Sequence, residues 1–215
     1  MAQAAQQNID ARYSTNIKVG RDQVIHHYTI SQVECRPSNL PSSSLSFNDA
    51  PIDLLSSHFT SREEELDHTE NIFRTSHGSA PTRFAIWGIP GIGKSQLVLQ
   101  YVKLSYDWQK YSVIFWISGA TIEKLNQGFA KLLALVGHPD RDHPEQWVRL
   151  SSARRWLEES DMNGHFRWLL VLDNVGCEAV DFLQEHLPRK HSTAHILLTT
   201  RTKAIAEAAT TVAGQ

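Results

Sequence analysis

Short apolar runs and amphipathic stretches alternate along the chain from about residue 54 onward. The apolar runs predict four buried strands, at residues 82–87, 111–117, 166–172 and 195–200. Apolar residues at helical spacing predict helices at about residues 62–77, 96–110, 121–136, 144–159 and 179–187, with a last helix from about residue 202. The expected N-cap is Thr60 or Ser61 for the first of these helices and Thr121 for the third. Strands that alternate with helices of this length are typical of a parallel sheet with helices on its faces. We therefore expect an α/β domain.

The first 53 residues have a different composition. They are rich in Ser, Gln and Asn, and residues 36–44 have the Pro and Ser content of an unstructured linker. We predict a disordered, low-complexity N-terminal extension over residues 1–53 and a folded domain over residues 54–215. Within the extension, residues 8–33 contain two β-prone stretches around a turn. This pattern fits either a polar disordered tail or a short amyloid-type signalling motif that templates cross-β stacking in a partner.

Charge and cysteine content indicate which partners and which cellular compartment to expect. The 215 residues carry 21 Lys and Arg against 23 Asp and Glu, a net charge of -2, which gives no support for a broad nucleic-acid or membrane-binding surface. Cys35 and Cys177 are far apart, as in a protein with free thiols in a reducing compartment. No apolar run reaches bilayer length, and the first residues lack the features of a signal peptide. We expect a cytoplasmic protein without nucleic-acid or membrane partners.

A phosphate-binding loop pattern, G-x-x-x-x-G-K-[ST], is matched without a mismatch between a predicted strand and a predicted helix. Its glycines let backbone N–H groups turn toward phosphate oxygens, and the start of the helix adds the positive end of its dipole. Lys94 is expected to reach the β- and γ-phosphates, and the Ser95 hydroxyl to coordinate Mg2+. The predicted nucleotide-binding residues here are Gly88, Ile89, Pro90, Gly91, Ile92, Gly93, Lys94, Ser95 and Gln96. The sequence therefore predicts a P-loop NTPase fold, a three-layer sandwich with a mainly parallel sheet, that binds a nucleoside triphosphate or diphosphate.

An acidic residue, Asp173, follows the apolar run 168–172 at the carboxyl end of a predicted strand, where open α/β sheets bind ligands. There it can hold Mg2+ together with Ser95. A capping Asp after a buried strand looks the same by itself, but a position about 80 residues after a complete phosphate loop favours a magnesium site. The next residue is Asn174, and an amide cannot accept a proton at neutral pH. The best local position for a general base is therefore not acidic.

A third polar position, Arg201, ends the apolar run 195–200 after Thr199 and Thr200. An arginine there can contact the γ-phosphate and distinguish triphosphate from diphosphate, or it can be a solvated residue at a strand end. With Lys94 and Asp173 it completes the predicted set of catalytic residues.

These three motifs together resemble the NB-ARC branch of the signal-transduction ATPases with numerous domains (STAND). That branch includes plant disease-resistance proteins, apoptotic protease activators and fungal NOD-like receptors. The resemblance extends over about residues 54–205, and its motifs are residues 88–95, 169–174 and 198–201. It implies that the strand at 195–200 lies between the strands at 82–87 and 166–172.

An upstream segment, residues 58–63, resembles the family's Phe-x-Gly-Arg-Glu motif, with Ser61 in place of glycine. In the family this segment lies against the adenine, which implies base contacts for Phe59, Thr60 and Arg62. The bound nucleotide implied by the resemblance is ATP or ADP.

The resemblance implies a slow regulatory switch, in which ADP holds a closed state and exchange for ATP permits oligomerisation. Asn174 fits slow or no hydrolysis. Family members continue into helical and winged-helix subdomains and usually a repeat array, whereas this sequence stops at Gln215, so we expect a fragment, a truncated product or a reduced paralogue.

The favoured function is an ATP/ADP-dependent switch in an innate-immunity or other signalling pathway, with Mg2+ as cofactor. Its expected protein partners are further copies of itself or a downstream effector. Two alternatives stay open. One is a hydrolytic P-loop ATPase, which would need an acidic base that no motif supplies. The other is a truncated binding-only decoy or adaptor that acts through its N-terminal segment.

Overall fold

Parallel strands form one sheet at the centre of the domain. The computed structural model describes residues 45–60, 62–75, 78–160, 167–190 and 193–211. These residues form five strands, which are β1 (Phe47–Asn48), β2 (Thr82–Trp87), β3 (Val113–Ser118), β4 (Trp168–Val175) and β5 (His195–Thr200). They also form six α-helices and two short 3-10 helices, which are α1 (Glu63–Thr75), α2 (Lys94–Asp107), α3 (Ile122–Leu135), α4 (Gln146–Glu158), α5 (Ala179–His186), α6 (Lys203–Thr210), η1 (Ile52–Leu54) and η2 (Pro139–Asp142).

The strands lie in the order β1-β3-β4-β5-β2, and every neighbouring pair is parallel. β5 therefore lies between β2 and β4, as the family resemblance implied. Because the strands are parallel, their carboxyl ends share one edge of the sheet. The segments that follow β2, β4 and β5 meet at this edge, where α/β sheets bind ligands.

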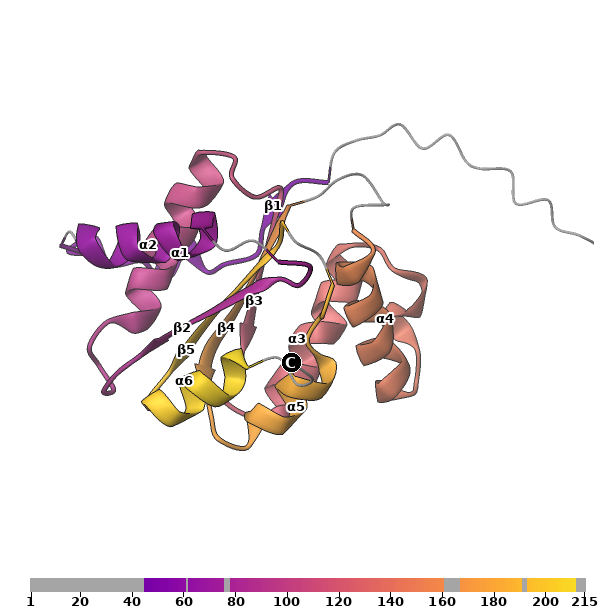
Figure 1. The fold of residues 1–215 in the computed structure, drawn as a ribbon. Helices are drawn as coiled ribbons and strands as arrows, with labels where there is room; N and C mark the ends of the chain where they lie inside the picture. Colours follow the sequence, from indigo (N-terminus) through magenta and orange to yellow (C-terminus); the bar gives the residue numbers. More distant parts are fainter. Residues whose placement is uncertain (1–44, 61, 76–77, 161–166, 191–192, 212–215) are drawn as a thin grey trace, which may run out of the picture. The chain divides into compact units, whose positions relative to one another are not determined.

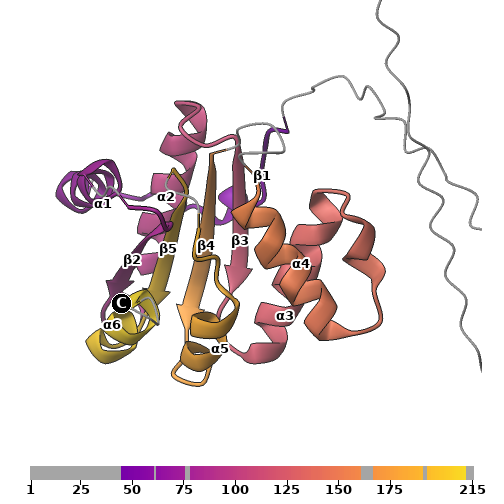
Figure 2. The same ribbon diagram turned by 45° about the vertical axis from the view of Figure 1, so that its right-hand side comes forward.

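Helices cover both faces of the sheet. α1 and α2 lie on one face, and α3, α4, α5 and α6 lie on the other (Figure 1 and Figure 2). Alternate residues of β4 serve the two cores: Leu169 and Val171 pack in one apolar cluster with α2, and Leu170 and Leu172 pack in the other with α3. A strand buried on both faces reads as a continuous apolar run. The predicted three-layer α/β sandwich is confirmed.

One strand, β1, was not predicted. Phe47 pairs with Val113 of β3, and its ring meets the ring of Phe115 edge-on with 5.4 Å between centroids. Asn48 Oδ1 then accepts a hydrogen bond of 3.0 Å from the N–H of Ala50, which turns the chain out of the strand. Two residues are too few to show a strand period in the sequence. The described sheet thus begins at residue 47, on the N-terminal side of the boundary that we expected after residue 53.

The contact between α3 and β3 depends on a glycine. A Cβ atom at Gly128 would lie 2.2 Å from Cγ2 of Ile117, so any larger residue would have to push the helix away from the sheet. α3 begins at the predicted N-cap, because Thr121 Oγ1 accepts a hydrogen bond of 3.3 Å from the N–H of Lys124. The capping residue expected for α1 was Thr60 or Ser61, and Ser61 lies outside the described residues.

A buried histidine begins β5 at the other edge of the sheet, away from the phosphate loop. His195 is 3% exposed, stacks on the ring of Phe73 at 4.4 Å, and hydrogen-bonds through Nδ1 with the Tyr111 hydroxyl at 2.6 Å. Burial, followed by the positive charges of Lys110 and Arg167, lowers the pKa of His195 to about 3. This imidazole is therefore neutral at pH 7 and belongs to the core.

Candidate functional site

The phosphate loop connects β2 to α2 and has the backbone that the motif predicts. Gly91 has a φ of 79° and Gly93 a φ of 88°, both in the left-handed region that favours glycine. Gly93 is also the N-cap of α2, and no side chain of the described residues caps this helix. The first N–H groups of α2 are therefore available to an anion, and the helix dipole favours negative charge there.

Lys94 reaches back over the loop. Its Nζ donates hydrogen bonds to the carbonyl oxygens of Gly88 at 2.8 Å and Ile89 at 3.0 Å. The ammonium group is thus held above the loop by two neutral acceptors. Phosphate oxygens carry full negative charge and form stronger, charge-assisted bonds with an ammonium group. The position of Lys94 fits the predicted contact with the β- and γ-phosphates.

Three oxygens meet beside the loop. Ser95 Oγ donates a hydrogen bond of 2.7 Å to Asp173 Oδ1, and Thr199 Oγ1 donates a second one of 2.6 Å to the same oxygen. Hydroxyl and carboxylate oxygens are the ligands that Mg2+ takes, usually together with waters and substrate phosphates. The donor set fits the predicted magnesium position. In a bound state the ion would lie at Ser95 and Asp173 and screen the charge of the phosphates.

A β-bulge interrupts β4 at Asp173. Leu172 pairs with Leu198 and Val175 with Thr200, so two residues of β4 lie opposite Thr199 alone. The extra residue is Asn174, whose φ of 60° is left-handed and whose N–H donates 2.7 Å to Thr199 Oγ1. Asp173 keeps the alternation of Leu169 and Val171 and faces α2, whereas the extra residue turns Val175 into the opposite core.

Asn174 itself is exposed at the edge of the sheet. It lines a cavity of about 320 Å3 together with Gly176, Glu178 and Arg201. The position after Asp173 thus faces an open space, and an amide occupies it. An amide can orient a water molecule by hydrogen bonding but cannot take its proton at neutral pH.

Arg201 comes directly after β5 and is exposed. It makes no hydrogen bond or ion pair with the other described residues, and it shares the cavity with Asn174. The structure therefore brings Arg201 to the same edge of the sheet as Lys94 and Asp173. It does not place Arg201 in the hydrogen-bond network of Asp173.

An N-terminal segment crosses the start of α2. We call residues 54–60 together with Arg62 the strap. Gln96 on α2 accepts a hydrogen bond of 2.7 Å from the N–H of Ser56 and donates one of 3.0 Å to the carbonyl of Leu54. Arg62 Nη2 donates to the carbonyl oxygen of Ile92 in the phosphate loop at 2.5 Å. The strap is thus attached to the loop and to the helix that follows it.

The predicted base contacts lie between these attachments. Phe59 is half-buried and Thr60 is exposed, and both come after Ser56 and before Arg62. Arg62 was predicted as a base contact, but its guanidinium group bonds the phosphate loop in this structure. Similarly, the side chain of Gln96 bonds the strap, which leaves its backbone N–H as the group that can face a phosphate.

Thr199 was not among the predicted site residues. The sequence did contain a signal for it. Thr199 has a hydroxyl group at the carboxyl end of a predicted buried strand, in the same polar triplet as Arg201. We assigned a role only to the arginine. The contact with Asp173 depends on the neighbouring order of β4 and β5, which the residues of one strand do not reveal.

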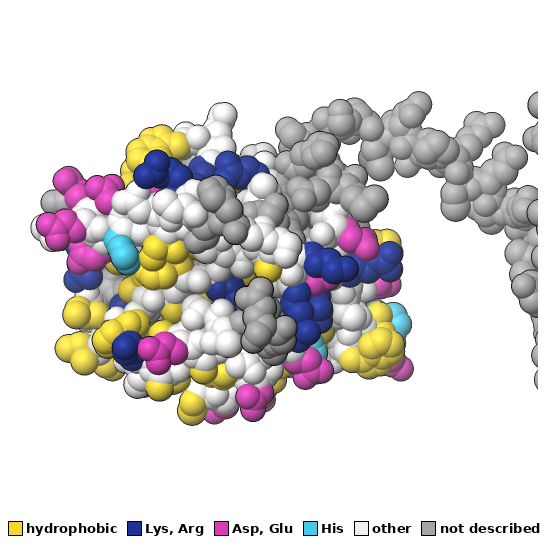
Figure 3. Space-filling model, in the orientation of Figure 1, with side chains coloured by type: hydrophobic (Ala, Val, Ile, Leu, Met, Phe, Trp, Pro, Cys, Tyr) yellow, Lys and Arg dark blue, Asp and Glu magenta, His cyan; other side chains and the backbone are white. Residues whose placement is uncertain are grey.

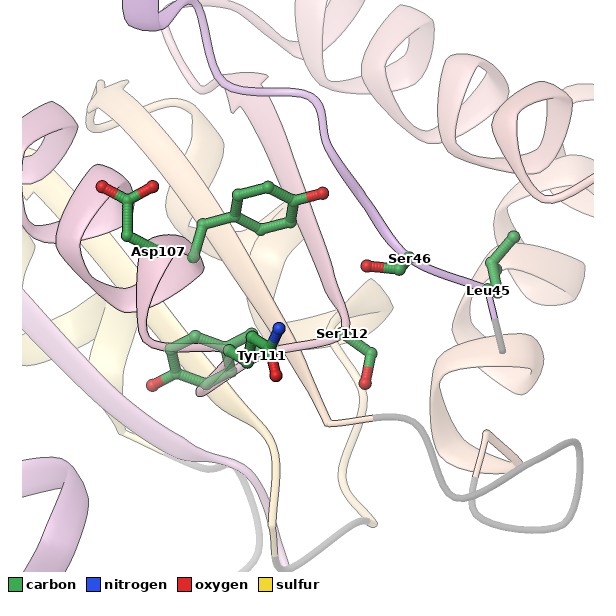
Figure 4. Close-up of a pocket in the computed structure, with 7 residues that line it drawn as sticks. Leu45, Ser46, Asp107, Tyr111 and Ser112 are labelled. Carbon is green, nitrogen blue, oxygen red and sulfur yellow. The ribbon is translucent and has the colours of Figure 1, made fainter. Parts of the chain in front are cut away.

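Another cavity lies far from this site. It has a volume of about 540 Å3, and its lining includes Ser46, Asp107 and Tyr111 (Figure 4). Asp107 ends α2, whereas Lys94 begins it, so the 14-residue helix separates the cavity from the phosphate loop by about 20 Å.

Charge is distributed unevenly around the site. Acidic side chains gather over α1, whose first turn is Glu63, Glu64 and Glu65, while other parts of this face mix both signs (Figure 3). The described residues contain no cluster of three His, Cys, Asp or Glu side chains that could hold a metal ion. None of the described helices has the length and apolar character needed to span a bilayer.

Comparison with known families agrees with this geometry. A family model described as the NB-ARC domain matches residues 62–214, which contain the phosphate loop, Asp173 and Arg201. The chain belongs to the NB-ARC family. Its fold is that of a nucleotide-binding domain, and the suspected resemblance is confirmed.

Individual relatives of this NB-ARC domain are distant. A nucleotide-binding leucine-rich repeat (NLR)-like protein of Hyaloscypha variabilis is 27% identical over 93 residues, which cover 43% of this chain and 9% of that protein. The ORC2 protein of Aeropyrum pernix in ADPNP–ADP complexes has a TM-score of 0.47 at 15% identity and matches 75% of this chain and 47% of its own. Drosophila ORC bound to DNA has a TM-score of 0.48 at 15% identity and matches 85% and 50%. The chain thus spans half or less of the length of these relatives.

Proposed function

We propose that this NB-ARC domain binds ADP and ATP with Mg2+ as the regulatory switch of a signalling protein, and that it hydrolyses ATP slowly or not at all. The observation that carries the proposal is the hydrogen bond of 2.7 Å between Ser95 and Asp173. It joins the phosphate loop to the acidic strand end across 78 residues of sequence. Both motifs of a nucleotide site are therefore assembled in one place.

Slow hydrolysis is supported by the residue after Asp173. Asn174 is held in the bulge by its N–H bond to Thr199, and its amide offers no base to an attacking water. A site that binds a triphosphate but has no general base is suited to keeping the protein in its nucleotide-bound state rather than to rapid hydrolysis. Arg201, exposed at the same edge, is the proposed sensor of the γ-phosphate. The NLR-like relative supports a role in signalling.

The test is titration calorimetry of the purified chain with ADP and with ATP, each with Mg2+. Lys94→Ala removes a charge-assisted contact worth about 1.5–3 kcal/mol, so the affinity for both nucleotides should fall at least about tenfold. Lys103→Ala, an exposed lysine on the same helix, is the matched control and should bind like the wild type. Equal nucleotide affinity of the wild type and the Lys94 variant would refute the site.

Release of inorganic phosphate separates the switch from an ATPase. We expect less than about one turnover per minute with saturating ATP and Mg2+. Sustained multiple turnover would instead favour the hydrolytic alternative. No binding of either nucleotide by the wild type would favour a binding-only role for this chain.

A further inference from the structure

The side chain of Gln96 is directed at the strap and not at the phosphate site. Its amide pairs with the backbone of the strap in two directions, accepting from the N–H of Ser56 at 2.7 Å and donating to the carbonyl of Leu54 at 3.0 Å. These bonds connect residues 40 and 42 positions apart in the sequence. Gln96 stands two residues after Lys94 on α2, so this attachment begins at the phosphate site itself.

The attachment continues to Phe59 through Ser56. The hydroxyl of Ser56 accepts a hydrogen bond of 3.2 Å from the N–H of His58, and its carbonyl accepts one of 3.1 Å from the N–H of Phe59. Ser56 therefore holds a tight turn that sets the direction in which Phe59 leaves the backbone. Because Gln96 fixes the N–H of Ser56, it also fixes the start of this turn.

The other end of the strap is held by the phosphate loop. Arg62 donates to the carbonyl of Ile92, and its Nη2 atom lies 3.6 Å from the place where a Cβ of Gly93 would be. The guanidinium group thus lies over the last glycine of the loop. Phe59 and Thr60 are held between two attachments, both of which lead to the segment that surrounds the phosphates.

We infer that Gln96 is a positioning residue for the base of the bound nucleotide. It anchors the strap to α2, so that Phe59 and Thr60, the predicted base contacts, are held between Gln96 and the phosphate loop. This inference rests on the proposed nucleotide site and deepens it. The phosphates bind to the loop, and the contribution of the base depends on the strap and therefore on Gln96.

The test compares two probes, ADP and inorganic pyrophosphate, each with Mg2+ in titration calorimetry. Gln96→Met keeps the size of the side chain, its helix propensity and the backbone N–H, but removes both hydrogen bonds to the strap. Loss of two exposed hydrogen bonds should lower the affinity for ADP about fivefold to tenfold. The affinity for pyrophosphate, which has no nucleobase, should change less than about twofold. Gln100→Met is the matched control, because Gln100 is half-buried one turn further along α2 and its side chain makes no hydrogen bond with the described residues.

A second readout follows the strap itself. In the ADP complex, amide hydrogen exchange across residues 54–60 should be faster in Gln96→Met than in the wild type and in Gln100→Met. Equal weakening of ADP and pyrophosphate, or no weakening of either, would overturn the role of Gln96 while leaving the nucleotide site intact. Failure of the wild type to bind ADP, or undiminished binding by Lys94→Ala, would instead refute the proposed function, and the inference with it.

Discussion

Thr199 donates its hydroxyl proton to Asp173 at 2.6 Å and accepts the N–H of Asn174 at 2.7 Å, so one side chain holds both residues at the end of β4. The bulge leaves the N–H of Asn174 outside the regular ladder, and Thr199 supplies its acceptor. The carboxylate that would face Mg2+ is therefore oriented from the neighbouring strand.

Thr199→Val tests this role. Valine has nearly the shape of threonine but no hydroxyl, so Asp173 loses a donor and the N–H of Asn174 loses its acceptor. We expect the free energy of unfolding to fall by about 1–3 kcal/mol in urea titrations. The affinity for ADP should also lose most of its dependence on Mg2+. Thr199→Ser, which keeps the hydroxyl, should behave like the wild type, and a full magnesium dependence in the valine variant would contradict the role.

Arg201→Ala tests discrimination between nucleotides. If the guanidinium group contacts the γ-phosphate, its loss should lower the affinity for ATP about tenfold and the affinity for ADP less than about twofold. Lys203→Ala is the control, because Lys203 is an exposed cation two residues further on that pairs with Glu207. Calorimetric titrations that show equal losses for ATP and ADP would remove Arg201 from the role of sensor.

The stability of the domain should fall as the pH is lowered from 6.5 toward 3. The ordinary pKa of histidine is 6.5, and burial, Lys110 and Arg167 lower that of His195 to about 3 in the folded state. Between these values the unfolded chain binds one more proton than the folded chain, so acidification favours unfolding. The slope from this group approaches about 1.4 kcal/mol per pH unit. Urea unfolding at several pH values should show a flatter profile for His195→Gln, and an equally steep profile would assign the effect to other groups.

Gly128→Ala tests the packing of α3 on β3. The added methyl group would overlap Ile117, which should lower the free energy of unfolding by about 1–3 kcal/mol even though alanine is the better helix former. Gln127→Ala, on the exposed side of the same helix, should change stability by less than about 0.5 kcal/mol. An alanine variant at Gly128 as stable as the wild type would show that the helix can move away from the sheet at little cost.

Local signals carried much of the prediction. The predicted strand at 195–200 corresponds to β5 residue for residue, and the strand is buried on both faces around its apolar centre at 196–198. The phosphate loop and the Thr121 cap could be predicted equally well from the sequence, since each depends on residues close together in the chain. These features depend on backbone conformation that a few neighbouring residues determine.

Contacts between segments far apart in the chain were harder to predict from the sequence. Nothing in the run that ends at Asp173 indicates the bulge, because the bulge is defined by the pairing of β4 with β5. The prediction ended this strand at residue 172, whereas β4 continues to Val175. In the same way, Gln96 was predicted to bind the nucleotide because it directly follows the motif. The partners of its side chain in the strap are 40 and 42 residues away, and a sequence pattern gives no direction for a half-buried amide.

Because β5 separates β2 from β4, the two strands that carry the phosphate loop and Asp173 do not touch each other. β5 is paired with β2 along its whole length, from His195 beside Thr82 to Thr200 beside Trp87. Within the sheet, the loop strand therefore contacts β4 only through β5, whereas Ser95 contacts Asp173 directly beside the loop. The same strand leads through Arg201 directly into α6, so the proposed sensor of the γ-phosphate lies between β5 and this helix.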